Sequence, residues 1–288
     1  MAEMTGVPEP TLRAWERRYK IPTPRRTTSG YRLYGERELE QVRRMRALCD
    51  GGLAAADAAR AIAKETKKTS KRDDGEPFGQ SVRALLRAVD AFDELALERE
   101  VRRLAFLGPA LAVIDQVIVP TLHAVGDRWM AQELSVAQEH LISTKLGNVL
   151  RDFVRLAPGG TVPVLVACFA DEHHDLGALA TAARLATWGF HPIFLGARTP
   201  AEAVARAVAS LRPRAVALSV TTTPERERAR ELVEAYGAAC GRTPWAVGGR
   251  GVESIEDHVR AARGFVAGDN ADFEKWIRRV AKRKRRAA

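Results

Sequence analysis

The spacing of apolar residues divides the chain into three regions with different periodicity. Residues 1–66 repeat apolar side chains at the intervals of amphipathic helices, with an interruption around Ser29-Gly30 that predicts a short two-stranded wing. Residues 79–157 keep the helical period apart from brief breaks, which predicts four helices packed as an antiparallel bundle. Residues 160–274 alternate short apolar runs with helical segments, which predicts buried strands joined by helices.

The alternating region predicts a parallel, doubly wound sheet, which binds ligands beyond the carboxyl ends of its strands. Its five candidate strands are Val162–Cys168, Pro192–Leu195, Ala215–Val220, Trp245–Val247 and Gly264–Ala267. The expected fold is therefore multidomain α and α/β: a winged helix-turn-helix head, a four-helix bundle and a Rossmann-like (flavodoxin-like) domain. The polar residues 67–78 are predicted to form a linker, and residues 275–288 a basic tail.

The composition is that of an ordinary globular protein, and the net charge indicates what kind of partner the protein binds. The sequence is 46% hydrophobic and 28% charged, without an N-terminal signal or an apolar run near the roughly 18 residues of a membrane helix. These two absences predict that the protein has no membrane partner. Its three cysteines are far apart, which disfavours a disulfide framework or a zinc knuckle and predicts a cytoplasmic protein. The net charge of +10 favours contact with a polyanion.

Basic residues gather in two clusters. The first has seven basic residues between Arg13 and Arg32 against one acid, Glu16, with aromatic and turn residues among them. The second runs from Lys275 to Arg286. A solvated helix end explains the second cluster at least as well as a binding role does, whereas the mixture of residue types in the first favours nucleic acid.

The first cluster belongs to a longer motif. The segment Thr11–Tyr19 (TLRAWERRY) is followed by Pro24, by two arginines and by the segment Ser29–Tyr34 (SGYRLY). This motif closely resembles the MerR-type winged helix-turn-helix, which implies a regulator that binds double-stranded operator DNA. The helix is suited to the major groove and the wing to phosphates. The side chains implied for these contacts are Arg13, Arg17, Arg18, Arg25, Arg26, Tyr31 and Arg32.

The first strand-to-helix loop of the α/β region carries candidate metal chemistry. In the segment Phe169–Gly177 (FADEHHDLG), His174 follows the carboxylate Glu172 by two residues, and no glycine-rich phosphate loop is present. A neutral imidazole is a good transition-metal ligand, and a carboxylate can orient it through its other nitrogen. Taken alone, a pair of histidines in a loop is more often a polar surface feature than a metal site.

Two later segments strengthen the metal interpretation of this loop. The three elements, each at the end of a predicted strand, are Glu172-x-His174-x-x-Gly177, Ser219-Val220-Thr221 and Gly248-Gly249. This set resembles the cobalamin-binding domain family, and the resemblance implies that His174 is the lower axial ligand of cobalt. Glu172, where aspartate is commoner in the family, would support that histidine. The residues implied to line or approach the displaced nucleotide tail are Ser219, Thr221, Gly248 and Gly249.

The predicted bundle contains a second constellation, Trp129-x9-Glu139-His140, whose members are expected to face one opening. This spacing resembles the cobalamin-dependent photoreceptors of the CarH/LitR type, and the resemblance implies that the three side chains surround an adenosyl group on cobalt. Light-sensing members often have a histidine directly after the tryptophan, which takes the upper cobalt position after illumination. Here that residue is Met130, and a thioether is a weak, soft ligand.

The combined resemblance implies a repressor that binds adenosylcobalamin or another cobalamin. In the dark it would form a homo-oligomer, a tetramer, on operator DNA, and light would dissolve that assembly. Met130 keeps open a regulator that binds cobalamin without a light response. A corrinoid carrier for a methyltransferase would share the body but has no use for the head, and a DNA-binding protein with an empty sensor is a further alternative. No nucleophile–base pair is recognisable, so we expect no enzyme, and we expect a cytoplasmic location at the nucleoid.

Overall fold

The computed structural model describes residues 1–19, 21–22, 25–26, 32–33, 36–60, 62, 77–222 and 225–282. The chain divides into two compact units, Met1–Glu76 and Pro77–Ala288. Each unit is described by itself. Tyr31 and most of the predicted linker lie outside the described residues, as do the last residues of the predicted tail.

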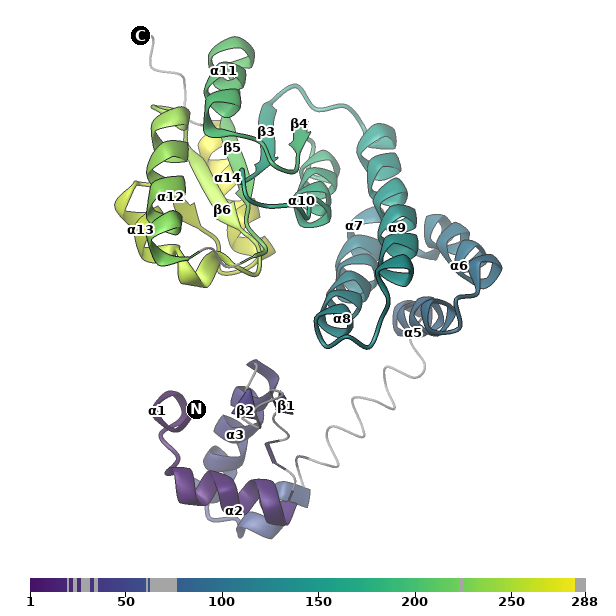
Figure 1. The fold of residues 1–288 in the computed structure, drawn as a ribbon, viewed down its shortest axis with the longest axis vertical. Helices are drawn as coiled ribbons and strands as arrows, with labels where there is room; N and C mark the ends of the chain where they lie inside the picture. The colour runs from purple at the N-terminus through teal and green to yellow at the C-terminus, as the bar shows by residue number, and fades with distance from the viewer. Residues whose placement is uncertain are drawn as a thin grey trace. The chain divides into compact units, whose positions relative to one another are not determined.

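The first unit is a small helical domain with a two-stranded wing. Its elements are α1 (Ala2–Thr5), α2 (Glu9–Tyr19), β1 (Arg25–Arg26), β2 (Arg32–Leu33), α3 (Glu36–Asp50) and a short helix at 55–60. Leu12 and Trp15 of α2 are buried with Val42 and Met45 of α3, so the apolar stripe predicted for the motif is core. The wing is antiparallel, with Arg26 opposite Arg32. The winged helix-turn-helix head is therefore confirmed (Figure 1).

The second unit begins with the predicted four-helix bundle. Its helical segments are α5 (Pro77–Asp90), α6 (Glu94–Leu107), α7 (Ala110–Val113), η1 (Ile114–Ile118), α8 (Val119–Met130) and α9 (Val136–Leu156). The three segments from α7 to α8 follow one another without a break and make the third helix. A π-helical turn, η1, directly precedes Pro120, which has no backbone N–H to continue an α-helical ladder. Ser135 and Gln138 form the capping box predicted at the start of α9.

The third helix corrects one statement from the sequence. Over 21 residues, Ala110–Met130 has a mean hydropathy of 1.2 and is long and apolar enough to match a membrane-spanning helix. Its buried side chains belong to the core of the bundle, where they pack against the other three helices and α10 (Leu176–Thr187). This packing accounts for its apolar character, because a core helix of a bundle passes the same test of length and composition.

The α/β domain has the predicted parallel sheet. The strands are β3 (Pro163–Cys168), β4 (His191–Gly196), β5 (Ala215–Ser219), β6 (Trp245–Gly248) and β7 (Phe265–Val266). They lie in the order β4-β3-β5-β6-β7, all parallel, and each predicted strand agrees within one residue at either end. This is the flavodoxin-like order, which places a topological switch point between β3 and β5. The predicted fold class is confirmed.

Helices cover both faces of this sheet (Figure 1). They are α10, α11 (Ala201–Leu211), η2 (Val252–Ser254), α12 (Arg226–Cys240), α13 (Glu256–Ala261) and α14 (Asn270–Lys282). Along β3, Leu165 and Ala167 face the core under α11, α12 and α13, whereas Val164, Val166 and Cys168 face the core under α10 and α14. This alternation follows from the two-residue period of a strand with helices on both sides.

The predicted basic tail is wrong in its first half. Residues 275–282 are the end of α14, whose Phe273, Trp276, Ile277 and Val280 are buried against the sheet. This agrees with the helix-end interpretation of the second basic cluster, although one side of the helix is buried, because apolar side chains recur at helical spacing between the charges. At the other boundary, α5 begins at Pro77 and so includes the last two residues of the predicted linker.

The bundle rests directly on the α/β domain. Leu179, Ala180 and Ala183 on the outer face of α10 belong to the core of the bundle, and α9 lies beside α10. Arg184, also on α10 and only 7% exposed, pairs with Asp115 of η1 at 2.7 Å. The strand ends that carry the candidate site are thus fixed close to the bundle.

Candidate cofactor site

The loop after β3 holds its histidine through a buried carboxylate. Glu172 is 2% exposed. Its Oε1 accepts hydrogen bonds from the backbone N–H of His174, at 2.7 Å, and from Nδ1 of the same residue, at 2.9 Å. The side chain and main chain of His174 are therefore both tied to one oxygen, as expected of a carboxylate that orients a ligating imidazole.

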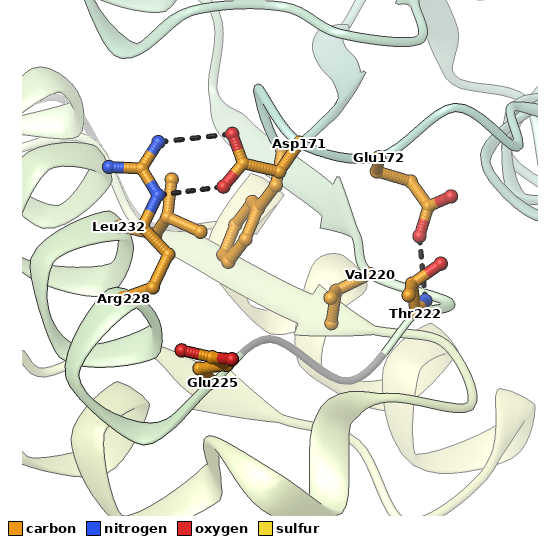
Figure 2. Close-up of a pocket in the computed structure, with 8 residues that line it drawn as sticks. Asp171, Glu172, Val220, Thr222, Glu225, Arg228 and Leu232 are labelled. Atoms are coloured by element: carbon orange, nitrogen blue, oxygen red, sulfur yellow. Dashed lines mark hydrogen bonds and ion pairs between the residues drawn. The ribbon is translucent and has the colours of Figure 1, made fainter.

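The second oxygen of Glu172 ties this loop to the end of β5. Oε2 accepts a hydrogen bond from the backbone N–H of Thr221, at 2.5 Å. It also accepts one from the backbone N–H of Thr222, at 2.8 Å (Figure 2). Burial would raise the pKa of this carboxyl, but the hydrogen bonds from His174 and the two threonines outweigh it and lower the pKa to about 2. Glu172 is therefore an anion at any physiological pH.

The imidazole of His174 is more than half exposed. Because Nδ1 is bound to Glu172, Nε2 is the nitrogen left to act as a ligand, and 56% of the side chain is exposed. The hydrogen bond that Nδ1 donates to Glu172 raises the pKa of His174 against the effect of desolvation, and the charges of Glu172, Glu139 and Asp175 add to the rise. Since Glu139 belongs to α9, the bundle contributes a charge to the surroundings of this imidazole.

Small residues shape the ends of β5 and β6. A Cβ placed on Gly177 would lie 3.6 Å from Oγ of Ser219, so these two residues face each other across the start of α10. Gly249 has φ of +112°, and a Cβ there would lie 2.2 Å from the carbonyl oxygen of Val220. That position accepts only glycine because of the protein backbone itself. A Cβ on Gly248 would meet nothing within 4 Å, so open space lies beside it.

The bundle residues of the predicted constellation are held less firmly. Oε2 of Glu139 lies 2.5 Å from Nδ1 of His140, and Oε1 accepts a 2.5 Å hydrogen bond from Ser143. His140 is 73% exposed at its side chain, and Trp129 is 40% exposed. Among the described residues, no hydrogen bond or ring contact joins Trp129 to the other two. Glu139 and His140 are brought together, and only Glu139 acts on His174 electrostatically.

An arginine that the sequence analysis passed over joins the two halves of this region. Arg250 directly follows the Gly-Gly turn, and its Nη2 lies 2.6 Å from Oδ1 of Asp127 on α8. The side chains are 47% and 29% exposed. His123, one turn before Asp127, has its pKa lowered by desolvation and by Arg250. The only sequence signal for this contact is the position of Arg250 beside the glycines, because its partner is 123 residues away.

A separate cavity of about 200 Å³ lies behind the loop (Figure 2). Its lining residues are Phe169, Asp171, Glu172, Val220, Thr222, Glu225, Arg228 and Leu232. Arg228 closes one side with two hydrogen bonds to Asp171, at 2.7 and 3.0 Å. His174 and Ser219 do not line this cavity, so Glu172 acts as a partition between it and the space in front of the imidazole.

The structure describes the side chains of some of the arginines predicted to contact DNA and leaves those of others outside the described residues. Arg17 and Arg18 are exposed on α2, and Arg18 lies over the ring of Tyr19 at 5.7 Å. Arg13 pairs with Glu9 at 2.5 Å and is 63% exposed at its side chain. Arg25, Arg26 and Arg32 lie on the wing strands, but their side chains are outside the described residues, as is the whole of Tyr31.

Comparison with known proteins assigns each region of the chain to a family. The model of the MerR HTH family regulatory protein matches residues 1–65, and two models described as B12 binding domain match residues 82–150 and 162–274. The chain is 35% identical over 263 residues to the HTH-type transcriptional repressor CarH of Myxococcus xanthus, covering 88% of both chains. It is 34% identical over 269 residues to CarA of the same organism, covering 91% of this chain and 88% of CarA.

One solved structure supports the fold of the body. The monomethylamine corrinoid protein of Methanosarcina barkeri aligns with a TM-score of 0.54 and 18% identity, over 67% of this chain and 94% of that one. At this identity the likeness concerns the fold alone. The curated relatives are transcriptional repressors, which agrees with the prediction that the chain is a regulator and not an enzyme. The head, the helical cap and the parallel sheet together place the chain in the family of MerR-type cobalamin-binding transcriptional regulators related to CarH and CarA.

Proposed function

We propose that this regulator is a repressor that binds adenosylcobalamin, and that its assembly and its affinity for operator DNA depend on cobalamin and on light. The observation that carries the proposal is the anchored imidazole of His174. Its Nδ1 is bound to a buried anion, more than half of its side chain is exposed, and a charged residue of the bundle acts on it. In the cytoplasm, at the nucleoid, such a protein would couple cofactor availability to transcription.

The donor set fits a corrinoid better than a free metal ion. In the part of the chain that the structure describes, no cluster of three or more His, Cys, Asp or Glu residues could hold a metal. A single imidazole cannot hold a metal ion by itself, since protein sites for transition metals use several ligands. It can serve as an axial ligand to cobalt whose other positions are filled by a corrin ring.

Each part of the site has a role in holding such a cofactor. His174 would supply the lower axial nitrogen, and Glu172 would keep its ring oriented and electron-rich. The residues that would line the space for the nucleotide tail are Gly177, Ser219, Thr221, Gly248 and Gly249. The open space at Gly248 and the closeness of Gly177 to Ser219, whose Oγ would lie 3.6 Å from a Cβ placed on Gly177, support this assignment. When bound, adenosylcobalamin supplies a cobalt–carbon bond that light can break.

Side chains of the bundle would contact the upper side of the cofactor and sense which group it carries. Trp129, Glu139 and His140 would surround the adenosyl group, and the exposure of Trp129 and His140 leaves these two side chains free to change neighbours. Contacts made only with the adenosyl form would stabilise a dark tetramer, because a ligand shifts an equilibrium by its differential affinity for the two states. Several heads on one tetramer would then bind DNA with high avidity. Their contacts would be those assigned to Arg13, Arg17, Arg18, Arg25, Arg26, Tyr31 and Arg32.

Met130 favours a second candidate function, a regulator that responds to cobalamin without responding to light. Met130 is 74% exposed at the end of α8. Its thioether would be a poor substitute for an imidazole as a ligand of cobalt, so Met130 would hold the cofactor less firmly than a histidine at this position. Under this alternative, occupancy of the site would control assembly directly.

Size-exclusion chromatography with adenosylcobalamin, in the dark and after green light, tests the proposal. Protein and corrin absorbance are followed together. A coloured tetramer that falls to smaller species on illumination is the expected result. A coloured species whose size ignores light would favour the second candidate function, and a colourless protein peak would contradict both.

A further inference from the structure

The positive charge of the second unit is concentrated at its end. Residues 77–269 have 21 basic and 22 acidic side chains, whereas residues 270–288 have eight basic and two acidic ones. The body of the protein is therefore close to neutral, and nearly all of its surplus charge lies on α14 and the residues that follow. Arg283, Lys284, Arg285 and Arg286 are part of this surplus and lie outside the described residues.

Within α14 the charge forms one exposed stripe. Lys275, Arg279 and Lys282 are four and three residues apart, so they lie above one another on the side of the helix opposite Trp276 and Ile277. The stripe is about 10 Å long, since each helical residue adds about 1.5 Å. All three are exposed.

Ion pairs within the described part of the domain engage the stripe only weakly. Among the described residues, no ion pair engages Arg279 or Lys282, and Lys275 meets Asp272 only at 3.6 Å with both side chains exposed. Cations near a helix C-terminus often stabilise the last carbonyls. Here that role is filled by Arg214, whose Nη2 donates hydrogen bonds to the carbonyl oxygens of Val280 and Ala281.

The stripe also lies away from the cofactor loops. Arg214 directly precedes β5, so the end of α14 is at the amino ends of the strands, whereas His174 and Ser219 follow their carboxyl ends. A partner bound to the stripe would leave the candidate cofactor site open. From this placement we propose that Lys275, Arg279 and Lys282 form a second, sequence-independent contact surface for the phosphate backbone of duplex DNA.

This surface would complement the head. Base edges read by the head would select the operator, and phosphate contacts by the stripe would add affinity that depends on salt and not on sequence. The spacing of single positive charges on an exposed helix suits phosphates, which need no precise geometry from Lys or Arg.

The test is the salt dependence of binding to a short fluorescent DNA duplex of random sequence, measured by anisotropy with the full chain. The variant is Arg279→Gln with Lys282→Gln. Its matched control is Arg206→Gln with Arg242→Gln, which removes two exposed arginines on and after the helices of the opposite sheet face. We expect the slope of log affinity against log salt to flatten by about 1.8 in the variant, because each phosphate contact contributes about 0.9.

The variant and its control are then both tested in a chain that also carries Arg17→Gln and Arg18→Gln in the head. A flattened slope there as well supports a surface that acts independently of the head, even if the operator proposal fails. Equal slopes for the variant and its control would overturn the inference. It would also be overturned if the variant kept its DNA slope but lost binding to phosphatidylglycerol vesicles, since the stripe would then serve a membrane surface.

Discussion

The lower and upper sides of the candidate cofactor site are held in different ways. On the lower side, Glu172 is buried, and its two oxygens accept four hydrogen bonds that fix His174 and the end of β5 together. On the upper side, His140 and Trp129 are exposed and are held mainly by their own helices. A ligand that stays bound needs a fixed anchor, whereas a sensor needs side chains that can change their contacts. The contrast suits a cofactor that is anchored by the α/β domain and whose upper side is sensed by the bundle.

The largest expected effect comes from removing the anchor itself. His174→Ala should weaken cobalamin binding at least about 100-fold, since loss of a mere supporting partner already costs 10- to 100-fold in metal sites. Titration followed by corrin absorbance measures it. The control is His173→Ala, which removes the exposed neighbouring imidazole. Equal binding losses in the two variants would refute the role of His174.

Glu172→Gln should weaken cobalamin binding about 10- to 100-fold, because a neutral amide orients and polarises the imidazole less well. It should also lower the free energy of unfolding of the protein without cofactor at pH 7, by about 1–3 kcal/mol. The pKa of Glu172 in the folded chain, about 2, lies below its ordinary value. Its contribution is therefore present above the ordinary pKa and is lost as the pH falls towards about 2.

The pH dependence gives this prediction a second measurement. Urea unfolding of the wild type and Glu172→Gln at pH 7 and near pH 3 should show the stability difference shrinking at the lower pH. A difference that stays constant between the two pH values would mean that the charge of Glu172 does not stabilise the fold.

Trp129→Ala tests the upper side of the site. It should weaken dark assembly about 30-fold, as expected for an aromatic side chain that contributes about 2 kcal/mol at a binding surface, and should leave cobalamin binding through His174 intact. Phe106→Ala, which removes an aromatic that is 91% exposed elsewhere on the bundle, is the control. Size-exclusion in the dark is the measurement, and an unchanged tetramer in Trp129→Ala would remove this residue from the proposed sensor.

The smallest effect is expected at the contact between the two sides. Arg250→Gln breaks the exposed ion pair with Asp127, which contributes at most about 1 kcal/mol. If this pair must open to admit a corrin ring, its loss should speed cobalamin association by up to about fivefold. Stopped-flow absorbance measures the rate, with Arg230→Gln, which breaks an ion pair within α12, as the control. A slower or unchanged rate would mean that the pair is no barrier to entry.

Local pattern was enough to define the elements of this protein. Short continuous apolar runs located the five strands, because a strand covered by helices on both faces is buried on both. The 3.6-residue period of apolar side chains located the bundle helices, because each of them buries one stripe. The motif around Glu172 and His174 indicated its chemistry because both residues lie in one short loop. At the basic end of the chain the α/β domain was predicted to stop at residue 274, whereas α14 continues to Lys282 with Trp276, Ile277 and Val280 buried.

Contacts between distant segments were decided by the tertiary structure alone. Arg250 and Asp127 are 123 residues apart, and Arg184 and Asp115 are 69 apart, so no periodicity links either pair. The same holds for the second oxygen of Glu172, which reaches Thr221 and Thr222 only because parallel strands β3 and β5 are neighbours. The sequence by itself indicated the families of the head and body and, through the resemblance, the loop that carries the proposed anchor. Only the folded chain determined how firmly each is held, because burial and hydrogen bonding depend on neighbours that the sequence places far away.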